Sequence, residues 1–204
     1  MISAQEALDR LKDGNREFAL SMQSGQGVRA GARQTELPQI QNPFAIILSC
    51  SDARVPAEIV FNQGLGDLFV IRVAGNIVAP SQVGSVEYAA ALYGTPLVVV
   101  MGHSQCGAIL ATLDEIRQPT ENQSRNLRSI VDRVRPSVEV LLKTELRNDR
   151  DALVEQAVRA NVLASVNHLR HGSELLEQLI QKRQFRVVGA EYSLKTGEVD
   201  FFEE

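Results

Sequence analysis

Short apolar segments alternate with amphipathic segments along most of the chain. Three runs of apolar and β-branched residues have the length of buried strands, namely Phe44–Cys50, Leu68–Val73 and Leu97–Gly102. Helical patterns accompany them at Pro56–Asn62, Gln82–Tyr93 and Cys106–Ile116. Buried strands that alternate with helices pair in parallel and are covered on both faces. The pattern therefore predicts an α/β fold with a mostly parallel central sheet flanked by helices.

The two ends of the chain add further elements to this sheet. Ser3 and Glu6 have the spacing of a capping box, and apolar residues follow at helical intervals, so the chain should open with a helix. After the third strand we expect two C-terminal helices and two closing strands. These are Ser124–Leu146, kinked at Pro136, then Asp151–His171, Phe185–Tyr192 and Glu198–Phe202, with a turn between the strands at Lys195-Thr196-Gly197.

A long segment without periodicity, Met22–Asn42, separates the first helix from the first strand. Loops of this length are uncommon inside a compact domain and usually cover or contact something. A wrap around a partner subunit and a plain surface segment are both open at this point. We divide the single domain into an N-terminal helical arm, residues 1–42, and an α/β unit, residues 43–204.

The composition is that of an ordinary globular protein and excludes several classes of function. The 204 residues are 44% hydrophobic and carry a formal net charge of −4, which gives no basic surplus for nucleic acid or anionic membrane. The apolar runs are too short to span a bilayer, and the polar N-terminus has no apolar signal core. We expect a cytoplasmic protein, with a processed periplasmic form as the alternative.

Two cysteines and a histidine lie at the ends of predicted strands. The first strand ends in Cys50-Ser51-Asp52-Ala53-Arg54, and the third in Gly102-His103-Ser104-Gln105-Cys106-Gly107. Ligands in open α/β sheets bind beyond the carboxyl ends of the strands, where these residues would converge. Two thiolates and an imidazole are donors that zinc prefers, and a set of three leaves a fourth position open. The sequence thus predicts a zinc site at Cys50, His103 and Cys106.

Other interpretations of the cysteines explain less. Cysteines at buried strand ends are often small apolar core residues, and a disulfide would leave His103 without a role. A dithiol redox pair usually has the spacing CxxC, which is absent. His168 and His171 form a competing pair on a predicted helix, but the apolar stripe of that helix faces elsewhere, so we place both in solvent. The glycine-rich loops that bind phosphates or dinucleotides are also absent.

Asp52 and Arg54 follow the first cysteine closely. A carboxylate there can ligate the metal or accept a hydrogen bond from a metal-bound hydroxide, and the arginine can hold it ionised. A plain surface ion pair is the simpler alternative for these two residues.

These motifs closely resemble those of the β-class carbonic anhydrases. The likeness runs from about Gln41 to Leu110, with weaker similarity to Val199, and it also includes Gly66-Asp67-Leu68-Phe69-Val70-Ile71-Arg72 and Ser85-Val86-Glu87-Tyr88-Ala89. The resemblance implies reversible hydration of CO2 to bicarbonate and a proton by a zinc-bound hydroxide. Zn²⁺ would be held by Cys50, His103 and Cys106, and Asp52 and Arg54 would form the catalytic dyad, with Asp52 as a fourth ligand in a closed state.

The resemblance also implies how the substrate pocket and the assembly are built. The pocket for CO2 and bicarbonate would include Gln41, Phe69, Tyr88 and Gly107. The family forms homodimers, often paired into tetramers, in which both subunits contribute to each pocket and the N-terminal segment packs on the partner. Taken without the family, Gln41 would be a plain loop residue and Phe69 a core residue.

One departure from the family pattern concerns regulation. A regulated branch of the family has a second bicarbonate site that uses a tryptophan three residues before the first cysteine. This chain has Ile47 there and no tryptophan, although Arg72 matches an arginine of that site. We therefore expect the plant-like subtype, without that inhibitory site. Two rival functions stay open on the sequence: a carbonyl sulfide or carbon disulfide hydrolase on the same scaffold, and a non-catalytic structural zinc protein.

Overall fold

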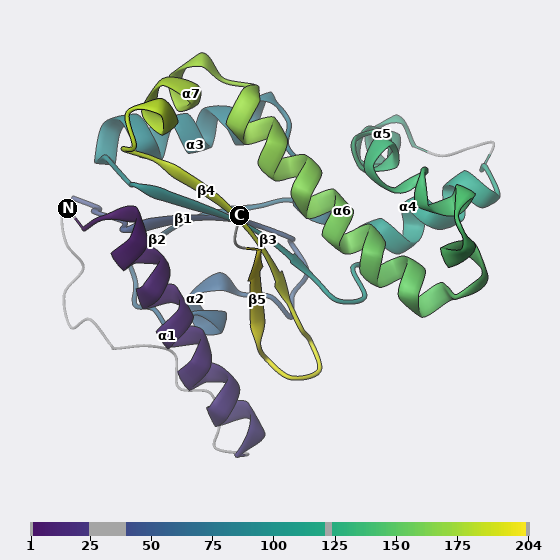
Figure 1. Cartoon of the computed structure of the whole chain (residues 1–204), viewed down its shortest axis with the longest axis horizontal. Helices are drawn as coiled ribbons and strands as arrows, with labels where there is room; N and C mark the ends of the chain where they lie inside the picture. The colour runs from purple at the N-terminus through teal and green to yellow at the C-terminus, as the bar shows by residue number, and fades with distance from the viewer. Residues whose placement is uncertain (1, 25–39, 121–123, 203–204) are drawn as a thin grey trace.

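Five strands form a single sheet in the computed structural model, which describes residues 2–24, 40–120 and 124–202 (Figure 1). The strand order is β2–β1–β3–β4–β5. The strands are β1 (Ala45–Ser49), β2 (Leu68–Arg72), β3 (Leu97–His103), β4 (Arg186–Tyr192) and β5 (Val199–Phe202). The first four are parallel, and β5 is antiparallel to β4. The predicted α/β fold with a mostly parallel sheet is confirmed.

Helices cover both faces of this sheet (Figure 1). One face carries α1 (Ala4–Gln23) and α2 (Ala57–Val60), and the other carries α3 (Pro80–Tyr93), α6 (Arg150–His171) and α7 (Glu174–Gln181). Side chains of successive strand residues point to opposite faces, so Ile47 joins the first layer while Ile46 and Leu48 join the second. All three are fully buried, which explains why β1 is apolar throughout.

A third apolar cluster lies beyond the carboxyl ends of the central strands. It is formed by α4 (Gly107–Arg117), α5 (Arg125–Val138) and the first half of α6, together with two short 3₁₀ turns, Leu141–Lys143 and Glu145–Asn148. Cys50 and Cys106 belong to this cluster. It therefore closes over the edge of the sheet where the sequence places the metal site.

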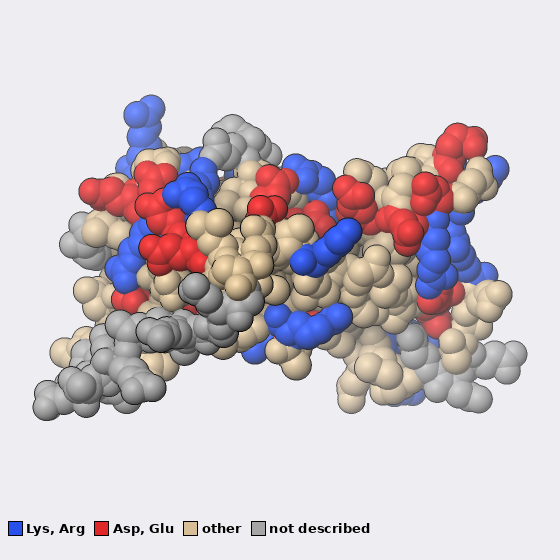
Figure 2. Space-filling model, turned by 90° about the horizontal axis from the view of Figure 1, so that it is seen from below, with Lys and Arg blue, Asp and Glu red and all other residues tan. Residues whose placement is uncertain are grey.

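Charged side chains do not gather into one region on the face shown in Figure 2. Lys and Arg side chains there are interspersed with Asp and Glu side chains of the described residues. Within the described ranges, none of the helices is both long enough and apolar enough to cross a bilayer.

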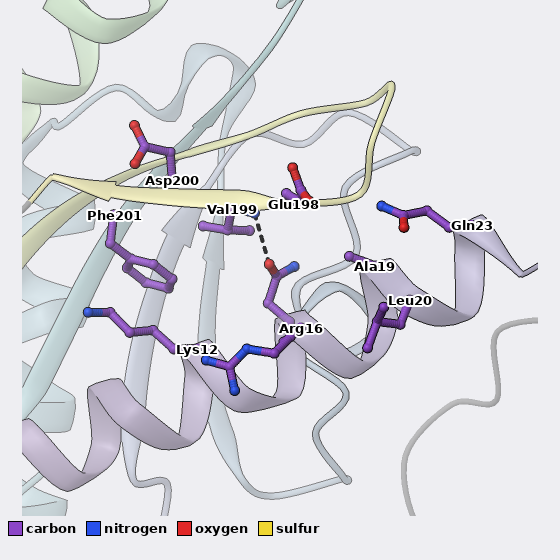
Figure 3. Close-up of a pocket in the computed structure, with 10 residues that line it drawn as sticks. Lys12, Arg16, Ala19, Leu20, Gln23, Glu198, Val199, Asp200 and Phe201 are labelled. Atoms are coloured by element: carbon purple, nitrogen blue, oxygen red, sulfur yellow. Dashed lines mark hydrogen bonds between the residues drawn. The ribbon is translucent and has the colours of Figure 1, made fainter.

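The first helix packs against the sheet of its own chain. Its capping box forms as predicted, because the Ser3 hydroxyl accepts from the Glu6 amide at 3.2 Å and the Glu6 carboxylate accepts from the Ser3 amide at 2.7 Å. Buried Asn15 accepts a hydrogen bond from the Val199 amide at 2.8 Å, and this bond fixes α1 beside β5. Figure 3 shows Val199 and Phe201 of β5 above Lys12 and Arg16 of α1. Most of Met22–Asn42 lies outside the described residues, so the packing of residues 1–42 on a partner stays a prediction.

The helical region before β4 differs from the prediction. A single helix was expected over Ser124–Leu146, but α5 ends at Val138 and the 3₁₀ turns follow it. Pro136 lies in the last turn of α5 and has no amide hydrogen for the carbonyl four residues earlier, so it marks the end of the helix and not a kink within it. The sequence analysis also missed α7, whose first turn is capped by the Ser173 hydroxyl accepting from the Leu176 amide.

Candidate metal centre

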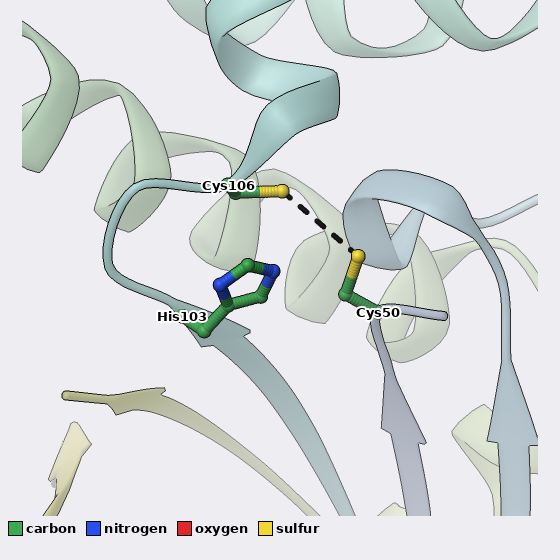
Figure 4. A group of neighbouring side chains, drawn as sticks. All are labelled: Cys50, His103 and Cys106. Carbon is green, nitrogen blue, oxygen red and sulfur yellow. Dashed lines mark hydrogen bonds between the residues drawn. The ribbon is translucent and has the colours of Figure 1, made fainter. Parts of the chain in front are cut away.

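The carboxyl ends of β1 and β3 bring three side chains to one point (Figure 4). Cys50 directly follows β1, His103 is the last residue of β3, and Cys106 is the N-cap of α4. The parallel register pairs Ser49 with Met101, which places the two strand ends side by side. One ligand atom of each of the three residues lies within 4.8 Å of the others. The convergence expected from the sequence is found.

The spacing of the two sulfur atoms fits a tetrahedral metal site. The Sγ atoms of Cys50 and Cys106 are 4.0 Å apart. Two thiolates on a tetrahedral zinc ion at about 2.3 Å from the metal would be about 3.8 Å apart. Both cysteines and His103 are almost wholly buried, with relative exposures of 5%, 1% and 0%. The donor set is thus compact and shielded from solvent.

The histidine has one ring nitrogen with a protein partner and one without. His103 Nδ1 lies 3.0 Å from the Ser104 carbonyl oxygen and donates its hydrogen there. Nε2 then carries the lone pair, and this buried atom has no hydrogen-bond partner among the residues that the structure describes. Buried polar atoms without a partner are rare in proteins. Metal-binding histidines commonly use one ring nitrogen for the metal while the other donates to a carbonyl, so the tautomer fits a metal ligand.

The contact between the two thiols lowers the pKa of one and raises the pKa of the other. The hydrogen bond from Cys106, helped by the Gly75 amide, lowers the pKa of Cys50 to about 4. The pKa of Cys106 is raised, because it donates that hydrogen bond and is buried beside the Cys50 thiolate. The pair gives up its first proton easily and its second reluctantly. A dication between the sulfur atoms would remove the repulsion that holds the second proton.

Asp52 and Arg54 form a two-pronged ion pair beside this cluster. The guanidinium donates to both carboxylate oxygens of Asp52, at 2.9 and 2.8 Å, and the Arg54 amide adds a third bond at 3.0 Å. The hydrogen bonds from Arg54 hold the pKa of Asp52 well below its usual range. Asp52 Oδ2 lies 3.8 Å from His103 Nε2, so one oxygen of the carboxylate faces the cluster. Asp52 itself is not among the three clustered ligands.

Arg72 fixes the loop that carries these residues. From the end of β2, its guanidinium donates to the carbonyl of Cys50 at 3.1 Å and also to the carbonyl of Asp52. Sequence analysis linked Arg72 only to a possible second bicarbonate site. In the structure, the guanidinium instead holds the Cys50–Asp52 loop against β2 through these hydrogen bonds.

The predicted pocket residues fall into two groups. Gly107, the first residue of α4, follows Cys106 directly, and a side chain at this position would meet nothing within 4 Å. Gln41, Phe69 and Tyr88 lie elsewhere in the chain. Phe69 pairs in register with Ile46, four residues before Cys50. At about 3.3 Å per strand residue, this separation is about 13 Å.

Gln41, Phe69 and Tyr88 nevertheless form a cluster of their own, completed by Tyr93. Gln41 donates to the Tyr93 hydroxyl at 2.8 Å, and the Tyr93 hydroxyl bonds to that of Tyr88 at 3.2 Å. The Phe69 ring lies 6.3 and 6.4 Å from the two tyrosine rings. We call these four residues the aromatic cluster. Sequence reasoning missed Tyr93, which the family motifs did not include.

The remaining histidines take no part in the site. His168 and His171 are exposed near the end of α6, as predicted from the apolar stripe of that helix. Together, the geometry at Cys50, His103 and Cys106 gives a buried, three-donor site with a carboxylate beside it, at the expected edge of a parallel sheet.

Comparison with known proteins finds carbonic anhydrases among the relatives of this chain. The family model for carbonic anhydrase matches residues 45–199. A carbonic anhydrase of Mycolicibacterium smegmatis is 38% identical over 192 residues, covering 93% of this chain and 89% of the relative. A β-carbonic anhydrase structure from Aspergillus fumigatus is 25% identical with a TM-score of 0.71, covering 80% of this chain and 76% of that one. Tetrameric β-carbonic anhydrases from Sordaria macrospora share the fold at 24% identity and a TM-score of 0.71, over 80% and 82% of the two chains.

The chain belongs to the β-class carbonic anhydrases, enzymes that interconvert carbon dioxide and bicarbonate. The family membership expected from the sequence motifs is confirmed. The rival functions, a sulfide hydrolase and a structural zinc protein, are not favoured by any of these relatives.

Proposed function

We propose that this chain hydrates CO2 reversibly at a zinc ion held by Cys50, His103 and Cys106. The observation that carries the proposal is the buried His103 Nε2, which has no hydrogen-bond partner in the described part of the chain and lies beside two thiols 4.0 Å apart. When bound, zinc supplies a water molecule acidic enough to act as a nucleophile near neutral pH. The three donors leave one tetrahedral position for that water.

Asp52 orients the attacking water in this proposal. Arg54 keeps the carboxylate ionised and donates to both of its oxygens, and Oδ2, which also faces the cluster, has a second lone pair to accept a hydrogen bond there. When the carboxylate accepts a hydrogen bond from the attacking water, it turns the lone pair of the water oxygen toward CO2. A closed structural site has no use for such a pair, which favours catalysis over a purely structural metal.

We further propose that the catalytic unit is a homodimer in which the aromatic cluster serves the partner's metal site. The cluster lies too far from Cys50 of its own chain to contact a bound substrate there. It lies next to β2, an edge strand of the sheet, and Tyr88 and Leu92 on α3 are 48% and 64% exposed. An exposed aromatic patch beside an open strand edge is typical of an interface. The Gln41 amide would then bind a substrate oxygen, and Phe69 would pack against CO2.

Bicarbonate should act at the catalytic site alone. Ile47 of β1, where the regulated branch has tryptophan, is fully buried in the apolar layer on the α1 side of the sheet. The Arg72 guanidinium donates its hydrogen bonds to the Cys50 and Asp52 carbonyls. Both observations support the plant-like subtype for this chain.

The shared pocket predicts that two inactive variants restore each other. Cys50→Ala removes a metal ligand, and Gln41→Ala removes a pocket residue, so each homodimer should be nearly inactive. In a heterodimer, the intact metal site of one chain meets the intact Gln41 of the other. Such a dimer, purified through two different affinity tags, should have about half the wild-type turnover, because one of its two equivalent sites is complete.

The matched control is a heterodimer of Cys50→Ala with His103→Ala, in which both metal sites are damaged and no recovery is expected. A Cys50→Ala and Gln41→Ala heterodimer with no more activity than its parents would contradict a pocket shared between subunits. That outcome would not contradict the proposed metal ligands.

A further inference from the structure

A short segment after β2 presents its backbone to the proposed metal ligand. In the 3₁₀ turn Ala74–Asn76, the Gly75 amide donates to Cys50 Sγ at 3.4 Å. Gly75 and the next residue, Asn76, both have positive φ angles, 69° and 43°. The left-handed conformation is unfavourable for residues other than glycine and persists only where the surroundings impose it. The amide therefore has to be held against the sulfur atom by other contacts.

Two buried polar side chains of α6 hold this turn from the other side. Asn161 Nδ2 donates to the Gly75 carbonyl at 2.8 Å, and Ser165 Oγ donates to the Asn76 carbonyl at 3.1 Å. Asn161 and Ser165 are four residues apart, so they lie on the same face of the helix. Both are buried, at 2% and 6% exposure, in a stretch of α6 that is otherwise apolar on this side. Polar residues in such positions are favourable only when their hydrogen bonds are made.

We propose that Asn161, supported by Ser165, is a positioning residue that fixes the Gly75 amide on the Cys50 thiolate. This inference rests on the proposed zinc site, since a thiolate at Cys50 matters most when it binds a metal. Asn161 does not touch the reacting atoms. It acts through two linked hydrogen bonds, from its own amide to the Gly75 carbonyl and from the Gly75 amide to Cys50 Sγ.

The hydrogen bond to sulfur changes what the thiolate gives to a metal. An N–H group that shares the sulfur lone pairs reduces the charge donated to the metal and fixes the direction of the remaining lone pair. Hydrogen bonds to metal ligands commonly change metal affinity or activity by about 10- to 100-fold. In a site with two thiolates, which together cancel the charge of Zn²⁺, such withdrawal keeps the metal a stronger Lewis acid.

The turn itself is a poor place to test this idea. A Cβ at Gly75 would lie 3.0 Å from the Ala108 Cβ in addition to the strain of its φ angle, so Gly75→Ala would disturb α4 as well. Asn161→Leu is cleaner, because leucine branches at Cγ as asparagine does and leaves the Gly75 carbonyl without its donor. Ser165→Ala removes the hydrogen bond to the Asn76 carbonyl and changes the side-chain volume less.

The test is the absorption spectrum of the Co²⁺-substituted protein together with zinc affinity measured by competition with a chelator. In Asn161→Leu, the thiolate-to-Co²⁺ charge-transfer band should move to longer wavelength, because the sulfur atom donates more charge without the N–H group. Zinc affinity should fall about 10- to 100-fold, because the sulfur lone pair is no longer held in the direction of the metal. Ser165→Ala should move the band in the same direction by less. The matched control is Val166→Ala, a buried apolar position of α6 next to Ser165 that packs in the sheet-facing cluster. It should lower the melting temperature while leaving the band and the zinc affinity at wild-type values.

An unshifted band and unchanged zinc affinity in Asn161→Leu would overturn the inference. If that variant does not fold, an unshifted band in Ser165→Ala overturns it equally. A wild-type protein with no thiolate-to-Co²⁺ band would instead show that the proposed metal site is wrong, and the inference would fall with it. Failure of the positioning role and failure of the proposed function thus give different spectra.

Discussion

Asp52→Asn should lower CO2 hydration by about 100- to 1,000-fold while leaving zinc content and melting temperature close to wild type. The asparagine oxygen would accept the Arg54 hydrogen bonds that the carboxylate now receives, and its NH2 group would face the cluster. A donor at that position cannot accept the proton of the attacking water. Because Asp52 is not among the three clustered ligands, the metal should stay bound. Stopped-flow turnover and metal analysis of the same sample measure both effects.

The matched control for this variant is Asp200→Asn. Asp200 of β5 is also paired with an arginine, Arg159 of α6, at 3.1 Å, but this ion pair is exposed. Exposed pairs contribute little, so this variant should keep full activity. Wild-type turnover in Asp52→Asn would remove Asp52 from the mechanism. Loss of zinc together with activity would show that the Asp52 carboxylate binds the metal at rest.

Cys106→Ala should abolish both zinc binding and turnover. Loss of a group that only orients a metal ligand weakens binding by about 10- to 100-fold, so loss of a ligand itself should exceed that range. Zinc should therefore raise the melting temperature of the wild-type protein and leave that of the variant unchanged, since a ligand stabilises only the state that binds it. Thermal unfolding with and without added zinc, combined with metal analysis, checks this.

Thr112→Ala is the corresponding control on the same helix. Thr112 is buried on α4, and its hydroxyl donates to the Ala108 carbonyl at 2.8 Å. This variant should lose some stability and retain the zinc-dependent rise in melting temperature. A Cys106→Ala protein that still binds one zinc per chain and hydrates CO2 would contradict the assignment of the ligands.

The sheet and the metal cluster were predictable because each depends on a local pattern. Buried parallel strands need apolar residues on both faces, so the continuous apolar runs at β1 and β3 indicate buried strands. Residues at the carboxyl ends of neighbouring parallel strands must meet at one edge of the sheet, so Cys50 and His103 could be paired from position alone. The spacing of His103 and Cys106 then placed both at one turn.

Other parts of the site depend on contacts that leave no pattern in the sequence. Asn161 occupies a position on α6 that the helical periodicity marks as core, and only the structure shows its bond to Gly75. The separation of Phe69 and Tyr88 from the metal cluster follows from strand register, which a motif does not give.

The central claim is that hydration of CO2 depends on one metal ion at the Cys50–His103–Cys106 site. The most direct test is to titrate Zn²⁺ into metal-stripped protein while following CO2 hydration by stopped flow. The range from about pH 6.5 to 9 brackets the expected acidity of a metal-bound water. Turnover should rise in proportion to added zinc and stop rising at one zinc per chain. Turnover in the stripped protein, or none at full zinc occupancy across this pH range, would contradict the account.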